Sequence, residues 1–539
     1  MIYHGDSFKV LPTLDADSID ACITDPPYGI GFMNRKWDSF KPGEEAKRIV
    51  PNEAIQSDNP NLKGRHRSPA SSPSAVEYNR NLEGQREFQT WTENWAREVY
   101  RVLKPGAHLL VCGAPRSYHR MACGLEDAGF EIRDCLSWLY GQGFPKSLDV
   151  SKAIDKAERG VPQGGSDPTS PNHGSFKSGH PGAGPGMWMT KEGVKDTERE
   201  IIDEAKRWAG WGTGLKPGWE PIVLARKPLD YTVAENVITH GTGAINIDAT
   251  RINPGETIPG GGNGEAHNGG MFGSHQTKGT RPLVEPHNLG RWPANVVLSH
   301  TSECVQVGTK DIKGSNFKGH PEGHINQIYG KDHRPRPAAG YANEDGLETV
   351  ERWECAPDCP VRMLDEQTGD LATVGGPKHT THDSGMFGIG QPGTVYADSG
   401  GASRFFYTAK PSRSERDEGC YDLEASTGGE ATERVDGTAG LNSPRAGAGR
   451  RGGSQNIHPT VKPTDLMIWL VKLITPPNGV VLDPFLGSGT TGIACRWEEH
   501  PFIGIEKEAK YVEIARRRIT EANQLFAGEE PVIVHEIPV

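Results

Sequence analysis

Hydrophobic residues form short, regular runs near both ends of the chain and become sparse between them. The apolar run Ile19–Thr24 stops at two prolines, which predicts a buried strand ending in a turn, because proline cannot continue a sheet ladder. Apolar positions at helical spacing over 88–102 predict a helix, and the runs 108–112 and 130–140 predict two further strands. This alternation favours an α/β sheet covered by helices.

The C-terminal segment repeats the alternation more clearly. Apolar residues over 466–473 predict a helix, and the run 479–485 predicts a buried strand that leads into a glycine-rich turn. A helix is expected to open at Gly492, and the run 502–505 predicts another strand. Apolar residues spaced along 511–519 predict a closing helix, so both ends of the chain are expected to contribute to the folded core.

The middle of the chain, from about 141 to 457, is loop-rich. Glycines are dense at 160–186, 259–273 and 437–453, and flexible linker is the simpler interpretation of these patches. The 539 residues include 68 Gly and 41 Pro, a high share for a compact domain, so we expect a folded core that carries long loops. Short ordered islands are expected at 220–225, 236–247, 295–299 and 405–408.

Composition narrows the protein class. The net charge of −11 means that any surface for nucleic acid must be a local basic patch, and Arg445, Arg450 and Arg451 among glycines could order on phosphates. No apolar run is long enough to span a bilayer, and the N-terminus lacks the pattern of a signal peptide. Nine cysteines are too few for a disulfide scaffold, so the cytoplasm is the expected compartment.

A glycine-rich loop is expected between the strand 479–485 and the helix that follows it. Its sequence, from Asp483 to Thr491, lets the backbone pass close to a ligand, and the next strand ends at Glu506. An acidic residue there suits a contact to the ribose hydroxyls of an adenosine-containing cofactor. The loop lacks the lysine of a phosphate-binding loop and departs from the dinucleotide pattern. The alternative is a tight turn without a ligand.

A second candidate site follows the strand Ile19–Thr24. Asp25-Pro26-Pro27-Tyr28 offers a carboxylate, rigid carbonyl groups and an aromatic face at the carboxyl end of a strand, where open α/β sheets bind ligands. That combination suits a planar base with an exocyclic amine, which would donate to Asp25 and the Pro26 carbonyl while Tyr28 stacks on the ring. The alternative is a proline-rich turn capped by aspartate.

These two motifs together resemble the amino-group DNA methyltransferases that use S-adenosylmethionine. The order, with Asp25–Tyr28 first and the glycine loop last, is similar to the β group, whose members methylate adenine N6 or cytosine N4. Gly5-Asp6 and His458–Pro463 extend the resemblance, which covers roughly 1–150 and 456–524. It implies an α/β fold, a Rossmann-like class I methyltransferase sheet assembled from the N- and C-terminal segments, with a large loop-rich central insertion.

The resemblance also implies a domain organisation along the chain. It places a catalytic half at 1–150, a target-recognition or insert region at 151–455 and a cofactor-binding half at 456–539. The flipped base would be held by Asp25, Pro26, Pro27 and Tyr28. The residues placed at the cofactor are Asp6, Thr460, Lys462, Asp483, Phe485, Gly487, Ser488, Gly489, Thr490 and Glu506.

Within the cofactor set, the implied roles differ. Glu506 would hold the ribose, while Phe485 and the loop glycines would pack on the methionine and adenosine parts. Thr460 and Lys462 would lie near the cofactor carboxylate. Asp6 would contact the adenine or help to shape that pocket.

The expected activity is therefore methylation of an exocyclic amine in double-stranded DNA. In the family that the sequence resembles, an aspartate at the first motif position is more typical of adenine N6 than of cytosine N4 methylation. Methylation at cytosine C5 is disfavoured, because it needs a cysteine nucleophile that usually follows proline, and none of the nine cysteines does so. Methylation of an amine in RNA or of a protein amide, and a catalytically silent nucleic-acid-binding protein, remain alternatives. A homodimer stays open, and because no nuclease motif is found, any restriction activity is expected on another chain.

The central region contains a candidate metal site. His300 and Cys304 form one pair, and Cys355 and Cys359 form a second pair with the same spacing. Four such ligands could hold a tetrahedral structural Zn²⁺, which would benefit a region poor in apolar residues. Nearby histidines could substitute, namely His320, His324 and His333. The alternative is a set of isolated reduced thiols.

Overall fold

The computed structural model describes the two ends of the chain and parts of its middle. The described residues are 1–30, 38, 82–141, 147–158, 201–252, 290–301, 303–313, 316–317, 324–326, 330–332, 339–340, 347–369, 401–409, 414–425, 455–524 and 532–537. The three glycine-dense patches, the arginines at 445, 450 and 451, and two of the substitute histidines, at 320 and 333, lie outside these ranges.

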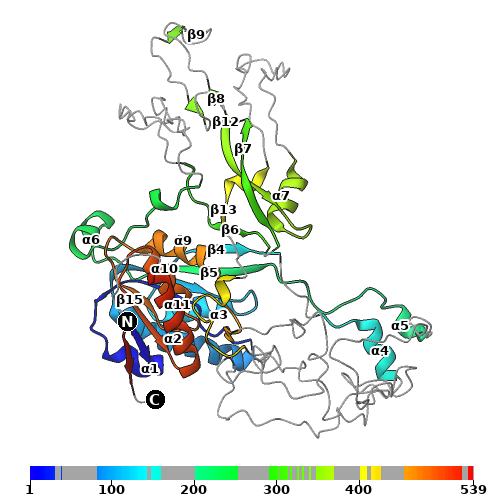
Figure 1. Ribbon diagram of the computed structural model, residues 1–539, viewed down its shortest axis with the longest axis horizontal. Helices are drawn as coiled ribbons and strands as arrows, with labels where there is room; N and C mark the ends of the chain where they lie inside the picture. The colour runs from blue at the N-terminus through cyan, green and yellow to red at the C-terminus, as the bar shows by residue number, and fades with distance from the viewer. Residues whose placement is uncertain are drawn as a thin grey trace, which may run out of the picture.

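A ten-stranded sheet forms the centre of the protein (Figure 1). Its strand order is β13-β6-β4-β5-β3-β2-β14-β15-β1-β16. The strands are β1 (Ile2–His4), β2 (Ile19–Thr24), β3 (Leu103–Cys112), β4 (Glu131–Leu139), β5 (Trp219–Arg226), β6 (Val296–Ser299), β13 (Tyr407–Ala409), β14 (Val481–Asp483), β15 (Phe502–Glu506) and β16 (Val534–Glu536).

Strand direction in this sheet is parallel except at β5. That strand runs antiparallel to both of its neighbours, β3 and β4. β2 pairs with β14 at the centre of the sheet, and β1 pairs with β15 near one edge, so segments from opposite ends of the chain lie side by side. The Rossmann-like class I sheet expected from the two terminal segments is therefore confirmed.

Helices cover both faces of the sheet. Those on one face are α2 (Leu82–Val102) and α3 (Tyr118–Asp127), and those on the other are α9 (Thr464–Ile474), α10 (Thr490–Trp497) and α11 (Ala509–Gln524). Successive side chains of a strand point to opposite faces, so Ala21 and Ile23 pack against the second group of helices while Cys22 packs against the first. Because both faces are covered, all six residues of β2 are buried, including Asp20 and Thr24.

Shorter elements surround this core. The helical ones are α1 (Ser7–Val10), η1 (Leu11–Thr13), α4 (Val150–Glu158), α5 (Asp203–Lys206), α6 (Val233–His240), η4 (Asp248–Thr250), α7 (Pro360–Thr368), η5 (Ala402–Phe405) and η6 (Ser414–Arg416). Small strands outside the main sheet are β8 (Asn316–Phe317), β9 (His324–Asn326), β10 (Gly330–Asp332) and β11 (Ala339–Gly340). Among the described helices, none combines the length and apolar character that a membrane crossing requires.

Some boundaries differ from the sequence-based expectation. Strand β3 begins at Leu103, earlier than the expected 108, and passes through Gly106, whose φ of 78° is accessible to glycine at little cost. The amide of Gly106 donates to the carbonyl groups of Lys227 and Pro228, so contacts distant in sequence extend the strand. Helix α10 likewise opens at Thr490, before the expected Gly492.

The central region contributes to the main sheet. Strands β5, β6 and β13 all come from 151–455, so the sheet extends beyond the segments 1–150 and 456–539 that were expected to form it. Two longer strands, β7 (Val305–Lys313) and β12 (Leu347–Glu354), form an antiparallel pair that projects away from the sheet, at the top of Figure 1. We call this pair the arm.

Candidate active site

A cavity of about 960 Å³ opens at the carboxyl ends of the central parallel strands. This is the edge at which open α/β sheets bind ligands. All of the expected catalytic and cofactor residues except Gly489 line it. These lining residues are Asp6, Asp25, Pro26, Pro27, Tyr28, Thr460, Lys462, Asp483, Phe485, Gly487, Ser488, Thr490 and Glu506.

Two glycines allow the loop between β14 and α10 to adopt its path. Gly487 has a φ of 54°, and a Cβ atom there would lie 2.8 Å from Nε2 of His458. Gly489 has a φ of 83°, and a Cβ atom there would lie 2.9 Å from the Cα atom of Ala515. Gly489 therefore lets the loop approach α11 behind the cavity, whereas Gly487 faces the cavity itself.

Glu506 lies at the end of β15 and is tied to the glycine loop. Its carboxylate accepts hydrogen bonds from the amides of Gly487, at 2.9 Å, and Glu508, at 2.8 Å. Burial raises the pKa of Glu506 to about 7, although these amide bonds act in the opposite direction. A carboxylate has about four lone-pair sites, so it can accept further hydrogen bonds from ligand hydroxyl groups.

Asp6 and Phe485 line the same part of the cavity. Asp6 caps α1 by accepting from the amide of Phe8 at 3.0 Å, and its second oxygen pairs with Lys507 at 2.7 Å. The ring of Phe485 packs against Trp91, with centroids 5.4 Å apart, so α2 fixes its position from behind. This part of the cavity therefore combines acidic groups with an aromatic wall.

Asp483 lines the cavity, but its carboxylate is directed into the protein interior. Its two oxygens accept hydrogen bonds from the hydroxyl groups of Thr24, at 2.7 Å, and Thr491, at 2.6 Å. Burial raises its pKa to about 6, and the hydroxyl bonds lower it. The Asp483 carboxylate therefore links β2, β14 and α10, and its contacts in this structure are internal to the protein.

A buried polar network occupies the part of the cavity that follows β2. Lys462 Nζ lies 2.7 Å from Asp25 Oδ2, 2.9 Å from the Tyr28 hydroxyl and 3.4 Å from Glu220 Oε2. The Tyr28 hydroxyl donates to Asp25 Oδ1 at 2.7 Å. The backbone carbonyl of Tyr28 accepts from Ser117, which fixes the motif against α3. Asp25 and Tyr28 are thus held in place before any ligand binds.

The electrostatics of this network favour a charged lysine. Burial alone would lower the pKa of Lys462, but the nearby carboxylates of Asp25 and Glu220 raise it well above its usual range. Burial and the same two carboxylates raise the pKa of Tyr28, so its hydroxyl stays protonated. The ammonium offsets the charge of Asp25 in an enclosed site, where an unpaired carboxylate would be costly.

Three residues of the site were not found from the sequence. Glu220 is the second residue of β5, and Tyr140, which follows β4, lies with its hydroxyl 3.3 Å from Glu220. Arg518 lies behind the glycine loop, where it donates to the Ser488 carbonyl at 2.7 Å. An arginine within the apolar face of the helix 511–519 was the available signal for Arg518. Glu220 gave no such signal. It reaches the cavity because β5 is antiparallel to its neighbours, and the sequence of a strand does not reveal its direction in the sheet.

The four expected metal ligands lie outside this cavity but close to one another. His300, Cys304, Cys355 and Cys359 bring their ligand atoms within 4.8 Å of each other. None of them lines the cavity. The structure thus contains two separate clusters of reactive side chains among its described residues.

The cavity itself has two chemical halves. The half around Glu506 offers hydrogen-bond acceptors and aromatic packing for a nucleoside-like ligand. The half around Asp25 offers a carboxylate and the ring of Tyr28 for a planar group that carries an amine. Both halves open into the same space, so the arrangement can hold two ligands in contact.

Comparisons with known proteins show which family the chain is similar to. The chain is similar to the Type II methyltransferase M.HindIII of Haemophilus influenzae, at 27% identity over 248 residues, which cover 46% of this chain and 64% of that protein. It is also 40% identical over 76 residues to the Type II methyltransferase M2.MboI of Moraxella bovis, covering 14% of this chain and 28% of the relative. The chain thus spans less than two thirds of the length of these relatives.

A solved structure of the M1.HpyAVI–SAM complex aligns with 96% of this chain and 98% of its own, at 12% identity and a TM-score of 0.29. The fold assignment rests on the sheet order and not on this superposition. Residues 19–157 and 303–517, more than half of the chain, match the family model described as DNA methylase. The two matched ranges include the Asp25–Tyr28 motif and the glycine loop. The chain belongs to the DNA methylase family.

Proposed function

We propose that the protein transfers a methyl group from S-adenosylmethionine to an exocyclic amine of a base in double-stranded DNA, with adenine N6 as the favoured target. The observation that carries this proposal is the convergence of the Asp25–Tyr28 motif and the Gly487–Glu506 loop on one cavity. Each motif alone has a simpler interpretation as a turn. Together they provide neighbouring places for a methyl donor and an amine.

The half of the cavity around Glu506 fits S-adenosylmethionine. The Glu506 carboxylate faces the cavity with lone pairs to spare for ribose hydroxyl groups, and Phe485 offers an apolar wall. Gly487 leaves room beside the loop that a larger residue would fill, since a Cβ atom there would meet His458. When bound, the cofactor supplies an electrophilic sulfonium methyl group.

The half around Asp25 fits the target base. An aromatic amine is a weak nucleophile because its lone pair is delocalised into the ring. Hydrogen bonds from the amine to Asp25 and to the Pro26 carbonyl would favour a tetrahedral nitrogen, whose lone pair can point toward the donor. Tyr28 would stack on the base. Catalysis would then consist of positioning and electrostatic stabilisation.

Lys462 and Glu220 would position Asp25, Lys462 by direct contact and Glu220 through its ion pair with Lys462. The resemblance placed Lys462 near the cofactor carboxylate, but in this structure its ammonium pairs with Asp25 at 2.7 Å. That contact would fix the direction of the Asp25 carboxylate. Both oxygens of Asp25 already have partners, so an entering amine must share an oxygen with Lys462 or displace the Tyr28 hydroxyl.

Access to the amine requires the base to leave the duplex. A base inside double-stranded DNA cannot reach a cavity of this kind, so we expect it to flip out of the stack. Recognition of the flanking duplex is assigned to the central region, because its arm projects beyond the sheet (Figure 1). The kinship with Type II methyltransferases suggests a place in restriction–modification, in the cytoplasm and with any nuclease on a separate chain.

One experiment addresses both activity and target. The full chain would be expressed in cells that lack DNA methylation, and their genomic DNA sequenced by a method that distinguishes N6-methyladenine from N4-methylcytosine. N6-methyladenine at a defined sequence is the expected result, and N4-methylcytosine would establish the alternative target. A lack of both marks, together with a lack of S-adenosylmethionine binding in calorimetry, would refute the proposal and support a silent nucleic-acid-binding protein.

A further inference from the structure

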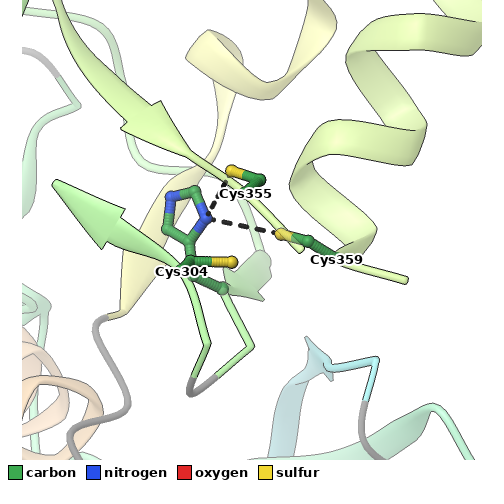
Figure 2. Close-up of side chains that lie close together, drawn as sticks. Cys304, Cys355 and Cys359 are labelled. Atoms are coloured by element: carbon green, nitrogen blue, oxygen red, sulfur yellow. Dashed lines mark hydrogen bonds between the residues drawn. The ribbon is translucent and has the colours of Figure 1, made fainter. Parts of the chain in front are cut away.

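Four chain segments meet at the base of the arm. His300 follows β6 of the main sheet, and Cys304 precedes β7. Cys355 follows β12, and Cys359 is the residue that caps α7. Figure 2 shows the three cysteine side chains directed toward one imidazole ring, with contacts from Cys355 and Cys359 to His300 Nδ1.

The nitrogen–sulfur distances in this cluster are close to those of a tetrahedral metal centre. His300 Nδ1 lies 3.4 Å from Cys359 Sγ and 3.5 Å from Cys355 Sγ. A tetrahedron with Zn–S bonds of about 2.3 Å and a Zn–N bond of about 2.1 Å has N···S edges of about 3.6 Å. All four ligand atoms lie within 4.8 Å of one another, so small adjustments would bring them around one ion.

The register of the arm explains why two of the cysteines face each other. The last pair of the β7–β12 ladder joins Val305 to Glu354. Cys304 and Cys355 are the residues immediately beyond this pair, on opposite strands. Adjacent positions on an antiparallel pair are close in space, although more than forty residues of chain separate these two in sequence.

The apolar contacts at the base of the arm are few. The buried hydrophobic cluster there has Leu298, Cys359 and Val361 as its fully buried members. On the arm itself, Val305 is 58% exposed and Val307 is 43% exposed. An isolated two-stranded hairpin is at best marginally stable in water, so burial of apolar surface does not account for the position of the arm.

We propose that His300, Cys304, Cys355 and Cys359 bind one structural Zn²⁺ that fastens the arm to the main sheet. Three thiolates and one imidazole form a closed ligand set with no open position for water. The ring of Trp353 stacks on His300 at a centroid distance of 3.9 Å and orients it. The imidazole comes from the end of β6 and the thiolates from the arm and α7, so the ion cross-links two parts of the fold.

Zinc suits this donor set better than the alternatives. Hard cations such as Mg²⁺ and Ca²⁺ prefer oxygen ligands, whereas thiolates and imidazole in tetrahedral geometry favour zinc. A disulfide would join two of the three cysteines, and the third thiol would remain beside the imidazole without a bond to sulfur or metal. The site lies outside the methyl-transfer cavity, so the ion would have no part in that reaction.

Metal analysis of the full chain, purified without chelators, tests the proposal first. About one equivalent of zinc per chain is expected, and less than about half an equivalent would overturn the assignment. The variants Cys304→Ser and Cys359→Ser should lose zinc. Cys123→Ser, a partly buried free cysteine in α3, is the matched control and should keep it.

A second measurement covers the case in which the serine variants fail to fold. The metal would be removed from the wild-type protein with a chelator and replaced with Co²⁺ added as its chloride. Absorption bands of tetrahedral cobalt with thiolate charge transfer are expected. An octahedral spectrum, as for cobalt held by water and carboxylates, would contradict the site.

Hydrogen exchange separates this proposal from the proposed function. Removal of zinc should reduce the protection of amides in β7 and β12, while amides of β2 and β14 and the binding of S-adenosylmethionine remain unchanged. If chelation left the exchange of the arm unaltered, the ion would not fasten it. A protein that binds zinc but not the cofactor would refute the methyltransferase proposal alone.

Discussion

Asp25 is held by a lysine and a tyrosine and faces the site proposed for the amine. Its replacement, Asp25→Ala, should lower kcat by more than tenfold, which corresponds to about 1.4 kcal/mol of barrier. The binding of S-adenosylmethionine should change little, because Asp25 lies in the other half of the cavity. Single-turnover methylation and calorimetry measure the two effects.

The control for this variant is Asp203→Ala, which removes an exposed carboxylate that does not line the cavity. It should leave both kcat and cofactor affinity unchanged. A kcat for Asp25→Ala above a tenth of the wild-type value would remove Asp25 from the reaction. Because Lys462 would lose its main partner, thermal unfolding of the variant should be measured alongside.

We expect Glu506 to make cofactor binding dependent on pH. Its pKa of about 7 without ligand means that near neutrality much of the carboxyl group is protonated. Ribose hydroxyl groups donate to the ionised form, so the affinity should rise with pH. If binding returns the pKa to its ordinary range, Kd should fall roughly tenfold from pH 6 to pH 8. Titration calorimetry across this range gives the slope.

The variant Glu506→Gln removes this titration and should flatten the part of the slope that Glu506 supplies. Subtraction of its profile also corrects for the cofactor's own amino group. The effect on folding has the opposite sign. A carboxyl group whose pKa rises on folding from 4.5 to about 7 takes up protons, so stability from this source falls as pH rises through that window. Identical slopes for both proteins would show that titration of Glu506 does not supply the pH dependence of cofactor binding.

At the residue scale, the sequence predicted side chains that stand directly after strands. Asp25, Tyr28 and Glu506 follow apolar runs, and the carboxyl ends of parallel strands gather at one edge of the sheet. Glu220 was missed because it lies near the start of its strand, and that end reaches this edge of the sheet only because β5 is antiparallel to its neighbours. Gly489 was placed at the cofactor because of its motif, but its contact is with α11.

At the scale of the element, the need for glycine in the loop between β14 and α10 can be tested by comparison with a glycine that ends a helix. Gly487→Ala should lower the free energy of unfolding by about 2–4 kcal/mol, because the left-handed backbone costs about 1–2 kcal/mol and the new methyl group meets His458. Cofactor affinity should fall as well. Urea denaturation and calorimetry provide both values.

Gly241→Ala is the matched control for this substitution. Gly241 ends α6 with a φ of 77°, and a Cβ atom there would meet no other atom within 4 Å. Its cost should therefore be only the backbone term, about 1 kcal/mol, with normal cofactor binding. Equal losses of stability in the two variants would show that contact with His458 is not important.

Elements with a local signal were predicted well, and those that depend on distant partners were not. The helix over 88–102 and the strand of 502–505 carry their periodicity in a single segment, and the structure has both. The place of β5, β6 and β13 in the main sheet depends on pairing with strands far away in sequence. No local pattern encodes such a pairing or its direction, and a loop-rich region conceals it further.

At the scale of the whole molecule, the arm offers a direct test of DNA recognition. The ladder of β7 and β12 ends with the pair Lys313 and Leu347, so residues 314–346 can be replaced by a two-residue Asn-Gly turn that suits an antiparallel hairpin. Zinc content and cofactor affinity should be retained. Methylation at the recognition sequence should fall at least tenfold relative to total methylation, as read by sequencing of DNA treated with each protein.

The full chain treated in parallel is the reference for this shortened protein. Unchanged kcat/KM on the same recognition sequence would show that residues 314–346 do not read DNA. A protein that loses cofactor binding as well would indicate that the deletion disturbed the sheet. Zinc content then reports whether the base of the arm is intact.

The reversed direction of β5 has a practical consequence. Because β5 is antiparallel to its neighbours, its first residues lie at the edge of the sheet where the cavity opens. The preceding residues, 214–218, therefore line the cavity. Leu215 in that stretch is 94% exposed, so its side chain is not needed for the core. Randomised libraries confined to these positions could alter the choice of target base while every strand of the scaffold keeps its sequence. Directed evolution of new methylation specificities would therefore begin there.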